Sequence, residues 1–270
     1  MFWTLRSVAI SLMLGLVFGQ IPARADVLFF DDFNGPTMNP VWQSSLPTLS
    51  GFTYLGAPPN AGFQSLNGAS VLRLTNSLNN LQQIGWSTAA SFDPTSFRLD
   101  VRFNTLVQSS STSIDGFVQS WLIDASQPSR YVMASPFEGG YSANPVFNVR
   151  GTIDSSGTNS SFNFINNTWY HLVIQGSSTQ NIRASIYADD NVTELIGYSL
   201  DYSAATAFPG GFRIGLGQYM GTPNRTAQVD VAVDYVSLTG AAVPEPSPLL
   251  LGGLGASVLG TLLCWKRRGE

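Results

Sequence analysis

The stretch FRLDVRFN, residues 97–104, alternates apolar and polar side chains without a break. Phe97, Leu99, Val101 and Phe103 therefore share one face, and the polar residues between them share the other. A period of two is the repeat of a β-strand, and strict alternation is typical of an antiparallel strand with one face on a core. The stretch predicts a half-buried antiparallel strand.

Short runs of the same kind occur along the chain on both sides of this strand. Residues 169–175 are apolar on both faces and predict a central strand, and Asp189-Asp190-Asn191 predicts a hairpin turn between strands at 182–188 and 194–200. No segment between Asp26 and Ala242 has a sustained helical period. A dozen or so short strands in one domain indicate two packed antiparallel sheets. The remaining predicted strands are 27–33, 70–76, 81–87, 117–123, 130–134, 146–150, 212–219 and 228–238.

Three segments also occur in a recognisable order. They are Phe29–Gly35 followed by Met38–Trp42, then Trp169–Ile174, and finally Val233–Leu238. This order resembles the opening, central and last strands of concanavalin A-like lectin and glucanase domains, including laminin-G-like modules. The resemblance implies an all-β jelly-roll sandwich in which the first and last strands pair. Because this fold serves lectins, glycosidases and inert surface modules, the function has to come from the sites.

The carboxylates do not form the pattern that hydrolysis by such a fold requires. The resemblance implies a Glu-x-Asp-x-x-Glu strand for a glycosidase, since retaining hydrolysis uses two carboxyl groups about 5 Å apart. The body contains only Glu138 and Glu194, and neither stands in this pattern. We therefore predict no catalytic residues and no enzymatic activity. A glycosidase with an unusual aspartate pair is the alternative.

Other reaction classes lack their residues. The single histidine, His171, stands within a predicted strand and is interpreted as a packed or hydrogen-bonded residue rather than a base. The single cysteine, Cys264, lies in the apolar C-terminal run, so the body has neither a disulfide nor the usual ligands of zinc. Gly215-Leu216-Gly217 lacks the third glycine and the helix of a dinucleotide site.

The charge of the body excludes nucleic acid as a partner. Between Asp26 and Ala242, about fifteen carboxylates stand against eight arginines, a net charge near −7. Such a domain repels polyanions, and no basic stripe compensates.

A sugar-binding site requires aromatic rings beside polar groups. Trp and Tyr within strands belong more often to the core, which is the competing interpretation for Trp86 and Trp121. Tyr141 and Tyr219 adjoin glycine-rich segments and are better candidates for exposure. The predicted carbohydrate-binding residues are Trp86, Trp121, Tyr141, Tyr219, Asn224 and Arg225.

The cofactor that we expect, if the fold holds one, is structural calcium, which takes several oxygen ligands. Asp31 or Asp32 on the first strand and Asp234 on the last would lie close together if these strands pair, as the resemblance implies. The turn at 189–191 is a weaker candidate, because Asp and Asn are also ordinary hairpin residues.

Both ends of the chain predict export. Residues 1–25 combine a positive start, an apolar run and the small-x-small site Ala23-Arg24-Ala25, which predicts a signal peptide cleaved by signal peptidase after Ala25. At the other end, a proline stalk at 243–248 precedes an apolar run at 249–265 and a basic end at 266–270. At about 1.5 Å per helical residue, this run is just long enough to span a bilayer, with its cations on the cytoplasmic side.

The C-terminal arrangement resembles the PEP-CTERM tail of Gram-negative bacteria, which an exosortase recognises. The residues that carry the resemblance are Val243, Pro244, Glu245, Pro246, Ser247, Lys266, Arg267 and Arg268. An ordinary membrane anchor is the alternative. The sequence thus predicts an exported β-sandwich at 26–242, held transiently in the inner membrane and delivered to the cell surface or matrix, where it binds exopolysaccharide. A ligand-free structural matrix protein is the other reading.

Overall fold

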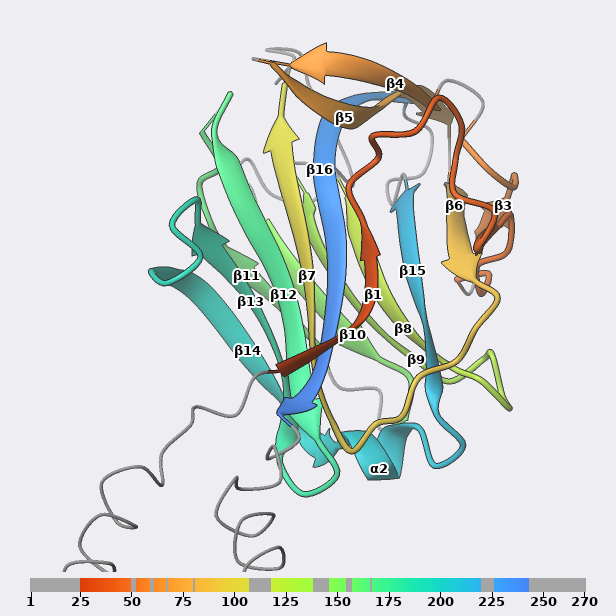
Figure 1. The fold of residues 1–270 in the computed structure, drawn as a ribbon, viewed down its shortest axis with the longest axis vertical. Helices are drawn as coiled ribbons and strands as arrows, with labels where there is room; N and C mark the ends of the chain where they lie inside the picture. Colours follow the sequence, from red (N-terminus) through yellow and green to blue (C-terminus); the bar gives the residue numbers. More distant parts are fainter. Residues whose placement is uncertain are drawn as a thin grey trace, which may run out of the picture. The chain divides into compact units, whose positions relative to one another are not determined.

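Strand β7 (Ser96–Thr105) contains the alternating stretch and lies within an eight-stranded sheet, here called sheet A. The computed structural model describes residues 25–49, 52–58, 61–66, 68–79, 81–106, 118–137, 146–153, 157–165, 167–219 and 226–242. The chain divides into two units, and the description below concerns Val27–Gly240. Figure 1 shows two layers of strands, which face each other across the core.

Sheet A has a central antiparallel pair, β7 and β16, with the other strands on either side. Strand β1 pairs with β16 beside the main order, so the first and last strands of the fold are neighbours, and Figure 1 shows them side by side. This pairing was expected from the sequence and is confirmed. In spatial order the strands are β14 (Glu194–Ser203), β13 (Asn181–Ala188), β12 (Trp169–Ser177), β7, β16 (Thr226–Ala242), β5 (Ala69–Asn79) and β4 (Ala61–Leu66), with β1 (Ala25–Asp31) on β16.

Sheet B forms the second layer. It is antiparallel except at β3, which runs parallel to β6. One short helix, α2 (Ala204–Ala207), follows β14, and Ser203 caps its N-terminus. In spatial order the strands are β11 (Gly157–Ser161), β10 (Val146–Gly151), β9 (Tyr131–Phe137), β8 (Gln119–Asp124), β15 (Phe212–Tyr219), β6 (Gln82–Thr88) and β2 (Trp42–Gln43), with β3 (Thr53–Tyr54) on β6.

The core lies between the sheets and contains the apolar face predicted for residues 97–104. Phe97, Leu99, Val101 and Phe103 are all at most 3% exposed and belong to one cluster with Phe212 of sheet B. The rings of Phe97 and Phe212 lie 4.8 Å apart. Burying a side chain of this size contributes about 1.5–3 kcal/mol, so these contacts between sheets are a main source of stability.

The predicted strands and the hairpin are confirmed in place, whereas the short edge strands were missed. Strand β15 has the predicted bounds, and β12 is central, between β7 and β13. At the hairpin, the Asp190 carboxylate accepts backbone N–H bonds from Val192 and Thr193, and Asn191 has φ +54°. The sequence did not predict β2, β3, β4, β11 or α2, which are too short or too polar to show a period.

The predicted signal peptide, stalk, membrane run and basic end lie outside the described residues, apart from Ala25, which begins β1. Within the ranges that the structure describes, no helix is both long and apolar enough to cross a bilayer.

Candidate functional site

The outer face of sheet B, turned away from sheet A, carries aromatic, amide and hydroxyl side chains. Alternation along β8 places Trp121 on this face and Leu122 in the core between the sheets. Strand register aligns residues of β6, β15 and β8 across the face. Two rows of paired residues result, Ser87–Gly215–Trp121 and Gly85–Gly217–Gln119. Because the residue of β15 in each row is a glycine, a trough without side chains runs along β15.

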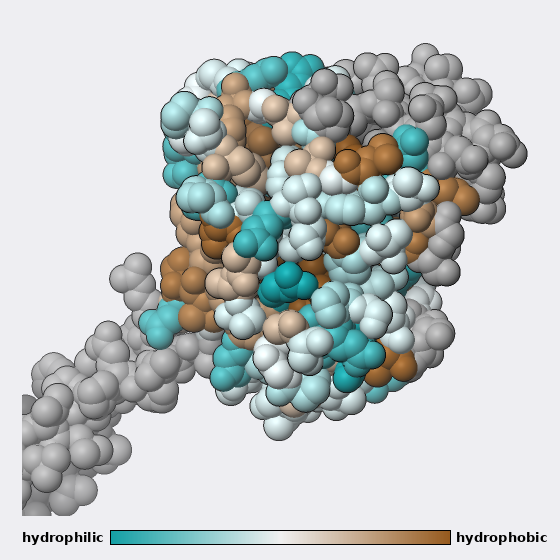
Figure 2. Space-filling view, turned by 90° about the vertical axis from the view of Figure 1, so that its right-hand side faces the viewer, coloured by the Kyte–Doolittle hydropathy of each residue, from teal (hydrophilic) through white to brown (hydrophobic). Residues whose placement is uncertain are grey.

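A segment of the chain crosses this trough. We call it the strap, residues 44–49 and 52–56. Its Leu46 occupies the space that the glycines leave, because a Cβ atom on Gly85, Gly215 or Gly217 would approach a Leu46 methyl carbon to 2.3, 2.6 or 2.7 Å. Leu49 is buried beside it, at 1% exposure. Figure 2, viewed from the side of β3 and β6, shows hydrophobic residues in small groups among hydrophilic ones.

Hydrogen bonds hold the strap at the edge of the sheet. The Leu49 amide donates to Gln83 Oε1, and Gln83 Nε2 donates to the Pro47 carbonyl, both at 3.1 Å. The Tyr54 hydroxyl donates to the Gly85 carbonyl at 2.8 Å. Burial raises the pKa of Tyr54, which keeps this donor protonated.

Several polar atoms on this face have no hydrogen-bond partner among the described residues. Ser87, Gln119 and Trp121 are fully buried, yet one polar atom of each is unpaired among the residues that the structure describes. Their neighbour Leu46 offers only methyl groups. A buried polar group without a partner costs about 1–3 kcal/mol and is rare, so it requires an explanation. The unpaired atoms on this face are Ser87 Oγ, Gln119 Oε1, Trp121 Nε1 and Arg213 Nε.

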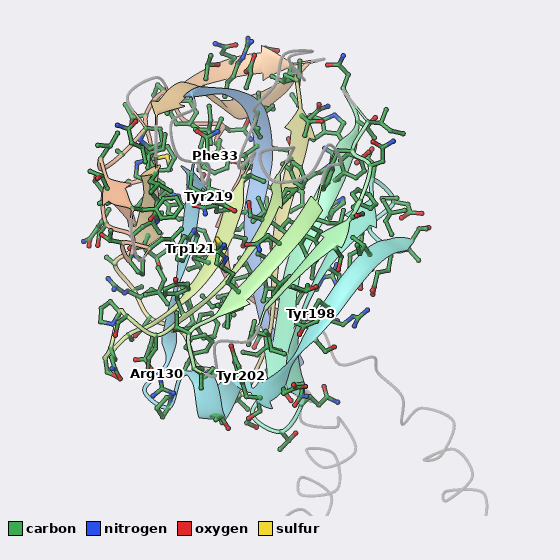
Figure 3. The ribbon with its side chains drawn as sticks, turned by 180° about the vertical axis from the view of Figure 1, so that it is seen from behind. Phe33, Trp121, Arg130, Tyr198, Tyr202 and Tyr219 are labelled. Carbon is green, nitrogen blue, oxygen red and sulfur yellow. The ribbon has the colours of Figure 1, made fainter. Side chains whose placement is uncertain are left out.

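The residues predicted to bind carbohydrate fall into three groups. Trp86 is 6% exposed and packs between the sheets, so it belongs to the core and offers no face to a ligand; this corrects its assignment. Trp121 and Tyr219 lie on the outer face of sheet B, as Figure 3 shows, but they are buried beneath the strap. The ring of Tyr219 lies 5.6 Å from that of Phe52. The other three, Tyr141, Asn224 and Arg225, lie outside the described residues.

Carboxylates are missing from this face in the described part of sheet B, whose strands contain a single acidic residue, Asp124 at the end of β8. Asp124 accepts from the Ser126 hydroxyl and from the Ser126 and Gln127 amides. Burial alone would raise its pKa, but these bonds and the charge of Arg130 outweigh burial and lower it. Asp124 therefore caps a turn as a carboxylate.

The outer face of sheet A is charged instead. His171 is 3% exposed, and its Nδ1 lies 2.9 Å from Asp100 Oδ1. Asn191 Nδ2 donates to the other carboxylate oxygen at 2.7 Å. The prediction that His171 is a packed, hydrogen-bonded residue is confirmed. Arg102 stacks on Trp169, 4.5 Å from the ring centre, and forms ion pairs with Asp189 and Asp234.

The aspartates assigned to calcium are engaged by other groups. Asp31 accepts from Trp42 Nε1 at 2.8 Å and from the Phe33 amide, and Asp32 accepts from Asn34. Asp234 Oδ2 lies 2.6 Å from Arg102, whose charge opposes a nearby cation. Among the described residues, no three His, Cys, Asp or Glu side chains are grouped to hold a metal ion. These contacts do not fit calcium at this site.

Sequence reasoning missed the glycine trough, the strap and the polar residues between them. One signal was present, because glycine inside a strand often marks the close approach of another group. Gly215 and Gly217 were considered only as a failed dinucleotide motif. No local pattern, however, connects Leu46 to glycines that follow it by about 170 residues.

No family model and no curated protein matches the chain. Several solved structures share its fold at low identity. The CBM2 module of the evolved Dit protein of Lactobacillus casei BL23 phage J-1 has a TM-score of 0.59 at 11% identity, covering 82% of this chain and 97% of that one. An endo-1,3-beta-glucanase from Streptomyces sioyaensis has a TM-score of 0.57 at 13% identity, covering 83% and 99%. Lectin II from Ulex europaeus has a TM-score of 0.55 at 14% identity, covering 80% and 99%. The fold is the concanavalin A-like jelly roll of lectins and glucanases alike.

Proposed function

We propose that the protein is an exported, non-catalytic surface or matrix module that binds polysaccharide through the outer face of sheet B. The observation that carries this proposal is the set of buried, unpaired polar atoms beside aromatic rings on that face. Sugar hydroxyls both donate and accept, so they can pair with an amide oxygen, a hydroxyl and an indole N–H. Leu46 satisfies none of these groups.

Binding requires the strap to move. A sugar chain lying in the glycine trough would take the place of Leu46 and contact Trp121 and Tyr219, which then supply the aromatic platform. The strap closes the face by burying two leucines, and binding has to offset that burial, which is worth about 1.5–3 kcal/mol for each side chain. Hydrogen bonds gained by the unpaired atoms and aromatic contacts favour the open form.

The absence of carboxylates from the described outer face of sheet B favours binding over hydrolysis, because retaining hydrolysis uses two of them. The glucanase among the structures of similar fold shows that the fold itself does not decide this question.

The test combines affinity with stability. The full chain, solubilised in a mild detergent, is titrated calorimetrically with exopolysaccharide from the producing strain, while reducing sugar is assayed. Ser87→Ala and Gln119→Met each remove an unpaired buried atom and nearly keep the shape, but Gln119→Met also removes the hydrogen bond from Gln119 Nε2 to Met133 Sδ. Ser87→Ala should therefore melt at a higher temperature than the parent, and both variants should bind more weakly. Leu46→Ala should melt lower and bind more tightly, because the open form becomes easier to reach.

A matched control is Ser178→Ala, at an exposed serine in the turn after β12 of sheet A, which should change neither property. Saturable heat without release of reducing sugar supports a binding module. Release of reducing sugar would establish the glycosidase alternative. If no polysaccharide gave a heat of binding, the interpretation as a structural matrix protein would remain.

For delivery, we propose cleavage after Ala25, passage through the secretion machinery and recognition of residues 243–247 by an exosortase in a Gram-negative host. The sequence pattern of the two ends supports this. Replacing Pro244-Glu245-Pro246 by three alanines should leave the protein in the inner-membrane fraction, whereas the parent reaches the surface or the medium. Unchanged delivery of the variant would contradict sorting through this motif.

Structural calcium stays a prediction from the sequence. A chelator that leaves the melting temperature unchanged would count against it, and the ion pair between Arg102 and Asp234 leads us to expect that result.

A further inference from the structure

The outer face of sheet A contains an open cavity of about 310 Å³, on the opposite side of the sandwich from the strap. Its base is formed by β7 and β16, whose register pairs Arg98 with Thr239 and Asp100 with Ser237. One side is formed by Phe30 of β1 and Tyr235 of β16, and another by Asn191 of the hairpin. Four separate segments of the chain therefore meet in one pocket.

The pocket has an accessible aromatic wall. Phe30 is 51% exposed, although it is a large apolar side chain, and its ring lies 5.9 Å from that of Tyr235 at a tilt of 34°. Such a wall fits the apolar face of a sugar ring. Burial, followed by the charge of Asp100, raises the pKa of Tyr235, so its hydroxyl stays protonated.

The polar groups of the pocket are fixed and both donate and accept. Arg98 donates to Gln175 and to Asn191 Oδ1, at 3.2 and 2.6 Å, and its side chain is 31% exposed, so further N–H groups are accessible. Asp100 is held by His171 and Asn191 and still has acceptor capacity on both oxygens. Groups held this way lose little freedom when a ligand binds.

Charge selects among ligands. Arg98 and Asp100 lie 3.7 Å apart and compensate each other, so the pocket attracts neither strong anions nor strong cations. The net negative charge of the body further disfavours acidic sugars. A volume near 310 Å³ is at the lower end for small-molecule sites, which suits one ring better than a long chain.

We propose that this pocket binds a single neutral sugar unit, as a second site independent of the outer face of sheet B. The sugar's apolar face lies against Phe30, and its hydroxyl groups donate to Asp100 and accept from Arg98 and Asn191. A module with one site on each outer face can bind two glycans at once.

The test uses the full chain in detergent and saturation-transfer NMR with the methyl glycosides of glucose, galactose and mannose, with methyl glucuronide as the charged probe. At least one neutral glycoside should bind saturably and more tightly than the glucuronide. Phe30→Ala should weaken this binding about tenfold, which corresponds to about 1.4 kcal/mol, whereas Phe30→Tyr should retain it. Leu195→Ala is the matched control, since Leu195 is also an exposed apolar side chain, at 41%, but lies on β14 outside both proposed sites.

A second variant, Ser237→Phe, fills the pocket without removing a charged group and should also abolish binding of the glycoside. Failure of every neutral glycoside to bind would overturn the proposal, as would tighter binding of the glucuronide or equal effects of Phe30→Ala and Leu195→Ala. Because Ser87→Ala and Gln119→Met act on the other face, they should leave glycoside binding unchanged. The two proposals can therefore fail separately.

Discussion

The two outer faces of the sandwich handle polar groups in opposite ways. On sheet A, the Asp100 carboxylate is buried but hydrogen-bonded through both oxygens, and Arg98 lies beside it. On sheet B, Gln119 and Trp121 are buried by an apolar strap that leaves a polar atom of each unpaired among the described residues. The buried polar groups of the first face pair with one another, whereas those of the second would gain from an external partner. They form a hydrogen-bonded network on sheet A, and on sheet B they lie beneath the strap, where we propose that polysaccharide binds.

The largest effect should come from the network of sheet A. Asp100→Ala removes the carboxylate that lies 2.9 Å from the buried His171 Nδ1 and accepts from the half-buried Asn191, and breaking a buried, paired charge typically costs about 3–5 kcal/mol. Urea unfolding would measure the loss. Asp93→Ala, an exposed aspartate in a loop before β7, is the control and should cost far less. A loss below about 1 kcal/mol for Asp100→Ala would mean that this network is not a source of stability.

The next effect should come from the trough of sheet B. A methyl group on Gly215 would approach Leu46 to 2.6 Å and Trp121 Cβ to 3.0 Å, so Gly215→Ala should destabilise the fold by about 1–3 kcal/mol. Because the closest atom belongs to the strap, adding Leu46→Ala should recover part of that loss in a double-mutant cycle. Additive effects of the two substitutions would show that the strap does not lie in the trough.

The same contrast explains what the sequence could predict. The alternation in residues 97–104 correctly assigned the inward face, because the period of a strand is set by adjacent residues. The pairing of the first and last strands was also expected, through a resemblance that extends along most of the body. The positions of His171 in a strand and of Asn191 in a hairpin turn could therefore be predicted, but their shared contact with Asp100 of β7 could not.

Sequence alone could not distinguish burial in the core from burial under the strap. Trp86 and Trp121 both stand in apolar strands, yet one faces the other sheet and the other faces Leu46. This difference depends on a segment without a periodic pattern, which crosses the sheet far from its place in the sequence. The pocket on sheet A was missed for a similar reason, since Phe30, Arg98, Asn191 and Ser237 come from four distant segments.

A smaller effect is expected at the ion pairs of Arg102. Asp189 is half exposed, and a surface ion pair contributes at most about 1 kcal/mol. Asp189→Asn should therefore cost less than about 1 kcal/mol, and the cost should shrink in high salt as the charges are screened. Asp234→Asn, whose carboxylate is more buried, should cost more. Equal costs that do not depend on salt would indicate that Arg102 acts through its stacking on Trp169 rather than through its charge.

The smallest effect concerns acid. Hydrogen bonds from the Thr193 hydroxyl and from the Thr193 and Val192 amides lower the pKa of Asp190 to about 2, from an ordinary value of 3.8. Because the folded value is the lower one, the charged carboxylate stabilises the fold above about pH 4, and this contribution is lost as the pH falls towards 2. In the Asp190→Asn variant, the melting temperature should fall less steeply with pH over this range than in the parent. At neutral pH, the two melting temperatures should differ by a small amount that does not depend on pH. Asp190 is fully exposed, so the change should be small compared with that of Asp100→Ala. If the melting temperature fell with the same slope below about pH 4 in parent and variant, the hairpin would not favour the charged form of Asp190.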